Sequence, residues 1–338
     1  MKIGIPRALL YSIYLPLWKT FLEELGHTVI LSNHTDQNIL DNGVKNCVDD
    51  ACLPVKIFHG HVTALAGRTD IILIPRLVSV YPGEFICPKF IGLPEMIKHS
   101  VPCNPGIIIM NFNARFSMDR GYDGMRNLGR ELGATKDLVA QALDRARIRQ
   151  AEHMRRMEAE PGFNPVRSID KKDQKPPRLD QGIIGLIGHP YLVYDRYINM
   201  NICDKLNERG YGILFPENIP AESVDRACNR YPKKLFWSYG KRLLGSGLCM
   251  LENKLVDGLI LLTSFGCGID AFIDELLIRA NHREYKIPLT TITLDEHTGQ
   301  AGFDTRLEAF IDMMEWRSRY DNHVPTYGTG VYPGKSLI

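Results

Sequence analysis

The chain has 338 residues, which exceeds one average domain and fits two. Hydrophobic residues make up 44% and charged residues 24%, as in ordinary globular proteins, and the formal net charge of +2 gives no electrostatic reason to expect nucleic acid or a membrane as partner. The first residues carry no signal-peptide pattern and no run approaches the ~20 apolar residues of a membrane span, so we expect a cytoplasmic protein.

The first part of the chain predicts alternating strands and helices. Strands are expected at residues 2–6, 27–32, 70–75 and 106–110. Helices are expected at residues 10–25 (closed by Gly26), 35–42 (closed by Gly43), 54–66 and, with interruptions, 118–160. This β-α-β-α order is typical of a parallel sheet with crossover helices. We therefore expect an N-terminal Rossmann-like α/β domain with a long helical end over residues 1–160.

A segment rich in Pro, Lys and Asp, residues 161–181, has no periodicity and is the expected linker. Beyond it strands are predicted at residues 182–188, 211–216, 256–264 and 289–294, and helices at 197–209, 233–253, 271–281 and 306–317. This pattern predicts a second Rossmann-like domain over residues 182–320. The last residues, 321–338, are rich in Gly, Pro and Tyr and are expected to be a flexible or partner-contacting tail.

The chain has eight cysteines, which are the main candidates for functional residues. A disulfide framework is not expected in a cytosolic protein of this size, so each cysteine is a packing residue, a catalytic thiol or a metal ligand. Cys203 and Cys249 lie within apolar helical patterns and are interpreted as packing residues. Cys52, Cys87 and Cys267 instead lie in loops after strands or at helix starts.

Cys267 lies on a turn between a predicted strand and a predicted helix, with Gly266 and Gly268 on either side. Glycine allows a positive φ and a close approach of the backbone to a ligand. The positive end of the helix dipole is expected to lower the pKa of a thiol placed there. Cys267 is therefore predicted to be either a nucleophile or a metal ligand.

Ligands of open α/β sheets bind beyond the carboxyl ends of the strands, so Cys52, Cys87 and Cys267 are expected to meet in the cleft between the two domains. Three thiolates there would form a site for a soft metal or an iron–sulfur cluster. Pro88, directly after Cys87, also recurs in loops that bind such clusters. The spacing contains no C-x-x-C pair among them, so it does not by itself select the metal.

A metal-free thiol enzyme with Cys267 as nucleophile stays open, because several histidines could serve as its base. They are His59, His61, His189 and His297. His59 and His61 are two residues apart on a predicted helix and are interpreted mainly as packing or ligand-orienting groups. Asp270 is interpreted as a helix N-cap, and residues 295–299 would line the cleft or form a domain contact. The chain contains no dinucleotide fingerprint and no Walker A loop.

Several stretches together resemble the family related to the 2-hydroxyacyl-CoA dehydratases and their activases, which includes the double-cubane iron–sulfur proteins. These stretches are Ile3-Gly4-Ile5-Pro6-Arg7-Ala8-Leu9, Ala51-Cys52-Leu53-Pro54-Val55-Lys56 with Phe58-His59-Gly60-His61, Ile86-Cys87-Pro88-Lys89-Phe90, Ile187-Gly188-His189-Pro190-Tyr191, Trp237-Ser238-Tyr239-Gly240-Lys241, Phe265-Gly266-Cys267-Gly268 and Asp295-Glu296-His297-Thr298-Gly299. They extend over most of the chain.

The resemblance implies two Rossmann-like domains with an iron–sulfur cluster in the interdomain cleft, either [4Fe–4S] or a double cubane [8Fe–9S]. It implies Cys52, Cys87 and Cys267 as metal ligands, and Gly266, Gly268 and Pro88 as cofactor-binding residues. Cys47 and Cys103 are additional candidate ligands, since a double cubane needs more than three thiolates.

The resemblance also implies an activity. The chain would accept low-potential electrons from an ATP-dependent activase of the ASKHA type, and would reduce or dehydrate a small substrate at an open iron, as a homodimer or with a related subunit. The alternative is a non-catalytic iron–sulfur electron relay or cluster scaffold.

Overall fold

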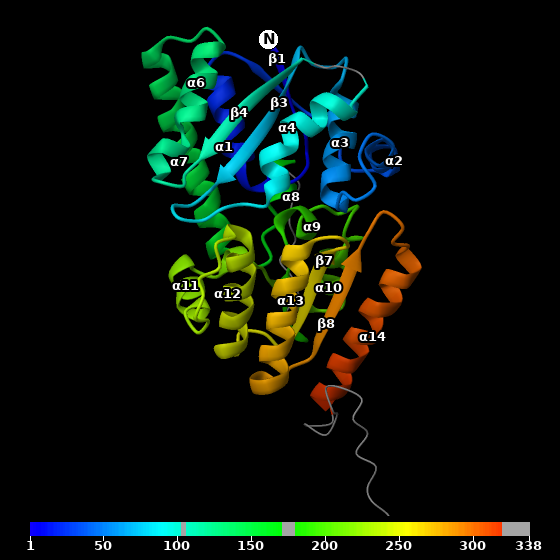
Figure 1. Cartoon of the computed structure of the whole chain (residues 1–338). Helices are drawn as coiled ribbons and strands as arrows, with labels where there is room; N and C mark the ends of the chain where they lie inside the picture. The colour runs from blue at the N-terminus through cyan, green and yellow to red at the C-terminus, as the bar shows by residue number, and fades with distance from the viewer. Residues whose placement is uncertain (103–105, 171–179, 320–338) are drawn as a thin grey trace, which may run out of the picture.

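Two halves, each an open sheet of four parallel strands flanked by helices, make up the molecule (Figure 1). The structure is a computed structural model and describes residues 1–102, 106–170 and 180–319. The two sheets confirm the predicted α/β class with two Rossmann-like domains. Within the described residues, no helix is long and apolar enough to cross a membrane.

The first sheet has the strand order β2-β1-β3-β4. Its strands are β1 (Lys2–Ile5), β2 (Thr28–Leu31), β3 (Ile71–Ser79) and β4 (Ile107–Asn113). The helices of this half are α1 (Tyr11–Glu24), α2 (Gln37–Lys45), α3 (Leu53–Leu65), α4 (Pro88–Ser100), α5 (Met118–Gly121), α6 (Asp123–Glu131) and α7 (Lys136–Ala159). The central strand β3 is mostly buried because helices cover a parallel sheet, which explains its continuous apolar sequence.

The second sheet repeats this topology with the order β6-β5-β7-β8. Its strands are β5 (Gly182–Ile187), β6 (Tyr211–Leu214), β7 (Gly258–Ser264) and β8 (Leu289–Leu294). The helices are α9 (Pro190–Val193), α10 (Ile202–Glu208), the 3₁₀ turn η1 (Pro216–Asn218), α11 (Ala221–Cys228), α12 (Ser238–Glu252), α13 (Gly268–Ala280), the π-helical turn η2 (Asn281–Tyr285) and α14 (Gln300–Arg319). The second half therefore has the same strand order as the first.

The carboxyl ends of the two sheets face one another. In Figure 1 the arrows of β3 and β4 point toward the second half, and the arrow of β8 points toward the first half. A single apolar core includes residues of both halves, among them Phe58 and Tyr194. The loops at these facing edges also pair directly, since Phe85 forms a parallel β-bridge with Trp237. The two halves are therefore packed together at the edges where α/β proteins bind ligands.

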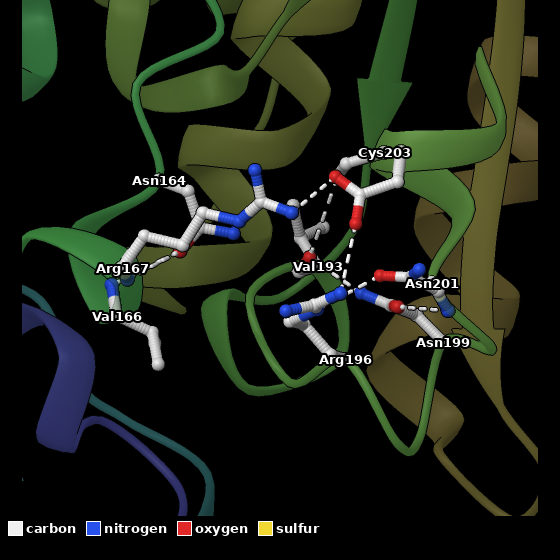
Figure 2. Close-up of polar contacts among 9 residues, drawn as sticks. Asn164, Val166, Arg167, Val193, Arg196, Asn199, Asn201 and Cys203 are labelled. Carbon is white, nitrogen blue, oxygen red and sulfur yellow. Dashed lines mark hydrogen bonds and ion pairs between the residues drawn. The ribbon is translucent and has the colours of Figure 1, made fainter. Parts of the chain in front are cut away.

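The segment between the halves contains a helix that its sequence did not predict, α8 (Pro165–Ile169). The Asn164 side chain caps this helix by accepting from the amides of Val166 and Arg167. Arg167 and Arg196 both bind the carboxylate of Asp204 on α10, as Figure 2 shows for the two arginines. This part of the expected linker is thus fixed to the second half. Residues 171–179, and the expected tail at 321–338, lie outside the described residues.

Several predicted element boundaries are wrong. Helix α2 does not end at Gly43 but continues to Lys45, because Gly43 serves helix packing: a Cβ there would lie 2.1 Å from the Lys56 carbonyl oxygen of α3. The helix expected over residues 233–253 begins only at Ser238, and α4 and α11 form where no helix was expected. Tertiary packing overrides the local signals at these points.

Candidate functional site

Each of the three predicted cysteines is the N-cap residue of a helix. Cys52 precedes α3, Cys87 precedes α4 and Cys267 precedes α13. Proline lies in the first turn of α3 and of α4, where its fixed φ and missing N–H group favour the start of a helix. None of the three N-caps has a side-chain cap hydrogen bond. The first amides of α3 and α13 favour the thiolate forms instead, since the Val55 amide lowers the pKa of Cys52 and the Ile269 and Asp270 amides lower that of Cys267.

The turn that carries Cys267 needs its first glycine and has open space beside it. Gly266 has a φ of +76°, the left-handed region that favours glycine, and Gly268 is the first residue of α13. A Cβ built on either glycine would meet no atom within 4 Å. The backbone therefore leaves room next to the Cys267 thiol.

The fold brings the three cysteines together from both halves of the chain. The thiols of Cys52, Cys87 and Cys267 all raise the pKa of the Tyr191 hydroxyl, after burial and the Asp270 charge. The Cys52 thiol also raises the pKa of Cys267, and the Cys87 thiol raises the pKa of Cys52. The three thiols are therefore close enough to influence the Tyr191 hydroxyl electrostatically.

His189 and Asp270 complete the group. The sulfur of Cys267, a ring nitrogen of His189 and a carboxylate oxygen of Asp270 all lie within 4.8 Å of one another. Nε2 of His189 is 2.9 Å from Oδ1 of Asp270, yet these two buried atoms and Nδ1 of His189 lack a well-aligned hydrogen bond to any described residue. Buried polar atoms are rarely left unpaired, so these atoms are suited to a partner that the protein chain does not supply.

Asp270 is not the predicted N-cap. That position belongs to Cys267, and Asp270 lies three residues further, where its Oδ2 accepts a hydrogen bond from the Ser264 amide. The Asp270 carboxylate thus links the first turn of α13 to the last residue of β7. The sequence indicated His189 as a possible base and as part of a stretch shared with the family. Its place two residues after strand β5 and before Pro190 was the signal for a site residue.

The predicted lowering of the thiol pKa by the helix dipole is wrong. Burial, followed by the charge of Asp270, raises the pKa of Cys267 to about 12. Burial also raises the pKa of Cys52, although the nearby Lys89 ammonium opposes it. Desolvation and neighbouring anions outweigh the dipole here. A nucleophile needs a lowered thiol pKa, whereas a bound cation would relieve this crowding of thiols and a carboxylate, so the metal-free thiol enzyme loses its support.

The remaining candidate residues lie in other surroundings. The Cys47 thiol is half-buried in the segment before α3, near Lys56 and Cys52, and Cys103 lies outside the described residues. Cys249 is buried in the core of the second half, and Cys203 packs against the larger core. These two positions confirm the interpretation as packing residues.

The histidines of α3 and the loop after β8 have structural partners. Nδ1 of His61 lies 2.8 Å from the Ser32 hydroxyl and Nε2 lies 3.1 Å from the Thr35 hydroxyl. Glu296, in the loop of residues 295–299, forms an ion pair with the buried Lys56. That loop therefore makes a contact between the two halves, which was one of its two predicted roles.

The donor set fits a soft metal centre. Three thiols from three helix starts, with an imidazole and a carboxylate beside one of them, are the ligand types of iron–sulfur and zinc sites. The three thiols are free rather than paired in disulfides. Helix N-termini add positive dipole ends, which suit the negative charge of a thiolate-bound cluster.

Comparison with protein families gives a match to the CoA enzyme activase uncharacterised domain over residues 2–219. The chain belongs to this family. The match covers more than half of the 338 residues and includes Cys52, Cys87 and His189, while Cys267 lies beyond its end. A search of curated proteins finds no match. Membership confirms the activase-related part of the resemblance seen in the sequence.

Proposed function

We propose that this protein holds an iron–sulfur cluster on Cys52, Cys87 and Cys267 and acts in a low-potential reductive system. The observation that supports this proposal is that three N-cap cysteines, from both halves of the chain, all act electrostatically on the Tyr191 hydroxyl. In the proposal the protein accepts electrons from an ATP-dependent activase and reduces or dehydrates a small substrate. Membership of the activase-related family supports that partner.

The residues of the chain have separate roles in this proposal. The three thiolates hold the cluster, and the first amides of α3, α4 and α13 stabilise its negative charge. His189 and Asp270 lie beside Cys267, where their unpaired atoms can donate to or accept from a group bound at the site. When bound, such a cluster supplies one-electron transfer and, at an iron without a protein ligand, a position for a small ligand.

The test is metal analysis of the protein purified without oxygen. We expect iron and acid-labile sulfide in the wild-type protein, and loss of most of both in Cys267→Ala. The matched control is Cys249→Ala, which removes a buried thiol in the core of the second half and should leave the iron content unchanged. Far-UV circular dichroism checks that both variants are folded.

Two results would overturn the proposal. One is wild-type protein that holds neither iron nor sulfide after reconstitution. The other is a folded Cys267→Ala protein with the iron content of the wild type. Whether the cluster is a single [4Fe–4S] or a double cubane would follow from the ratio of iron to protein in the same measurement.

A further inference from the structure

A candidate for a second site is a cavity of about 840 Å³ between the two halves. The loop after β3 lines it with Tyr81 and Glu84, η1 contributes Glu217, and the first turns of α12 contribute Tyr239 and Arg242. Its volume lies within the range of pockets that bind small molecules. None of the three cysteines, nor His189, lines this cavity.

The cavity lies next to the cysteine site, with Tyr239 as the shared wall. Tyr239 lines the cavity and also the small space beside Cys87 and His189. Its ring centroid is 6.0 Å from that of His189. Only the Tyr239 side chain would therefore separate a molecule in the cavity from His189, which lies beside Cys267.

Two cations of the cavity wall, Arg242 and the exposed Arg155, have no hydrogen-bond or ion-pair partner among the described residues, and Arg242 is the more buried of the two. The other α12 cation, Lys241, is occupied, because its Nζ lies 2.7 Å from Glu84 and 2.5 Å from Asp225. The half-buried guanidinium of Arg242 forms no hydrogen bond or ion pair with any residue that the structure describes. An unpaired guanidinium in a cavity wall is suited to a carboxylate, which it binds through two parallel hydrogen bonds.

The nearest buried carboxyl group does not neutralise Arg242. Glu217 is only 7% exposed and its Oε2 accepts a hydrogen bond of 2.8 Å from the Tyr194 hydroxyl, not from Arg242. Burial raises the pKa of Glu217, and the Arg242 charge opposes this rise.

The cavity also has apolar lining. Ile13, Met154 and Val224 contribute to it, together with Pro82 and Pro220. A ligand that matches this mixed lining has a carboxylate at one end and an apolar body.

We propose that this cavity binds a small organic acid, with its carboxylate on the Arg242 guanidinium and its apolar body along Ile13, Met154 and Val224. The binding needs no cluster. That the bound acid is the molecule acted on at the cysteine site rests on the proposed function above, and follows from the position of Tyr239 between the two sites.

The test is calorimetric titration of the full-length protein with hexanoate, hexanol and hexylamine. We expect hexanoate to bind, and the two probes without a carboxylate to bind at least about tenfold more weakly, because they lack the charge-assisted pair. Arg242→Met should weaken hexanoate binding by at least about tenfold, and Arg242→Lys should weaken it less, since it keeps the charge without the fork geometry.

The matched control is Arg279→Met, which removes an exposed guanidinium on α13 that is paired with Glu275. It should leave hexanoate binding unchanged. Equal binding of hexanol and hexanoate, or unchanged hexanoate binding by folded Arg242→Met, would overturn the proposal. Failure of the proposed function is distinguishable, because it appears in the iron content and not in the titration.

Discussion

At the scale of single residues, a relay of hydrogen bonds fixes His61 in one protonation state. The Thr35 hydroxyl donates to Asp195, so it must accept from Nε2–H of His61. Nδ1 of His61 then accepts from the Ser32 hydroxyl, which in turn accepts from the Arg7 amide. Burial, with the charges of Arg7 and His34, lowers the pKa of His61 to about 3. The histidine is thus neutral in the folded protein.

This lowered pKa predicts a loss of stability in mild acid. In the unfolded chain His61 has an ordinary pKa of about 6.5. Below that pH the unfolded state therefore binds a proton that the folded state does not bind. The contribution of neutral His61 to the free energy of unfolding is fully present above pH ~6.5. It decreases as the pH falls toward 3, by up to about 1.4 kcal/mol per pH unit. Urea unfolding at pH 7.5 and 5.5 should show a smaller pH difference for His61→Gln than for the wild type.

The control for this prediction is His99→Gln, because His99 is an exposed residue of α4. It should keep the wild-type difference in unfolding free energy between the two pH values. A His61→Gln protein with the same pH difference as the wild type would contradict the assigned protonation state.

At the scale of elements, the repeated topology explains where two of the cysteines lie. Cys87 follows the third strand of the first half and Cys267 follows the third strand of the second half, each at the start of the next helix. Cys52 has no such counterpart, since the corresponding helix start in the second half, that of α12, carries Trp237. The repeat therefore supplies two equivalent ligand positions, and the third position belongs to one half only.

Helices α2 and α3 approach closely through two glycines, and this contact is a test of the fold around Cys52. A Cβ on Gly60 would lie 1.9 Å from the Ile39 carbonyl oxygen. Gly60→Ala should therefore lower the free energy of unfolding by about 1–3 kcal/mol, since the two backbones would have to separate. Chemical denaturation of wild type and variant measures the difference.

Gly92 in α4 provides the matched control, because a Cβ there would meet no atom within 4 Å. Gly92→Ala should be neutral or stabilise the protein by up to about 1 kcal/mol, as alanine favours a helix over glycine. Equal effects of the two substitutions would show that helix propensity, and not the α2–α3 contact, decides the cost at Gly60.

At the scale of the whole molecule, the two halves are coupled through buried contacts near the candidate site. The Lys56 ammonium is almost completely buried and pairs with Glu296 across the interface. Burial raises the pKa of Glu296, but the hydrogen bond and charge of Lys56 outweigh this and hold it below its ordinary value. One apolar core also extends through both halves. We expect them to unfold together.

Lys56→Met should destabilise this coupling, because it leaves a partly buried Glu296 without its partner. We expect a loss of about 2 kcal/mol in the free energy of unfolding, below the 3–5 kcal/mol of a fully buried pair since Glu296 is partly exposed. The tryptophans report on both halves, with Trp18 in the first and Trp237 in the second. Their fluorescence and far-UV circular dichroism should give coincident transitions in the wild type.

Lys19→Met is the comparison for this prediction, because Lys19 and Glu23 form an exposed pair on α1 at 3.7 Å. Its effect should stay within about 0.5 kcal/mol, as surface pairs contribute little. If the two lysine variants lose the same stability, the Lys56 pair does not couple the halves. Two separate unfolding transitions in the wild type would contradict a shared core.

The sequence by itself determined the α/β class, the two sheets and the placement of Cys52 and Cys267 at the starts of helices. Strand and helix periods, Pro54 after Cys52 and the glycines around Cys267 are local signals, which can be recognised from neighbouring residues. Cys87 was predicted only in a loop, because the helix α4 was not expected. Gly43 was misread because a glycine that ends a helix and one that permits close packing look alike in sequence.

Only the tertiary structure decided that His189 and Asp270 lie beside Cys267. The sequence predicted that Cys52, Cys87 and Cys267 meet, but no local pattern indicated these two neighbours, whose position depends on the start of α13 lying close to the end of β5. The thiol pKa values likewise depend on burial and on the Asp270 charge, which outweigh the helix dipole that the sequence suggested. That Arg242 has no partner among the described residues is also visible only in the tertiary structure, since its neighbours come from both halves.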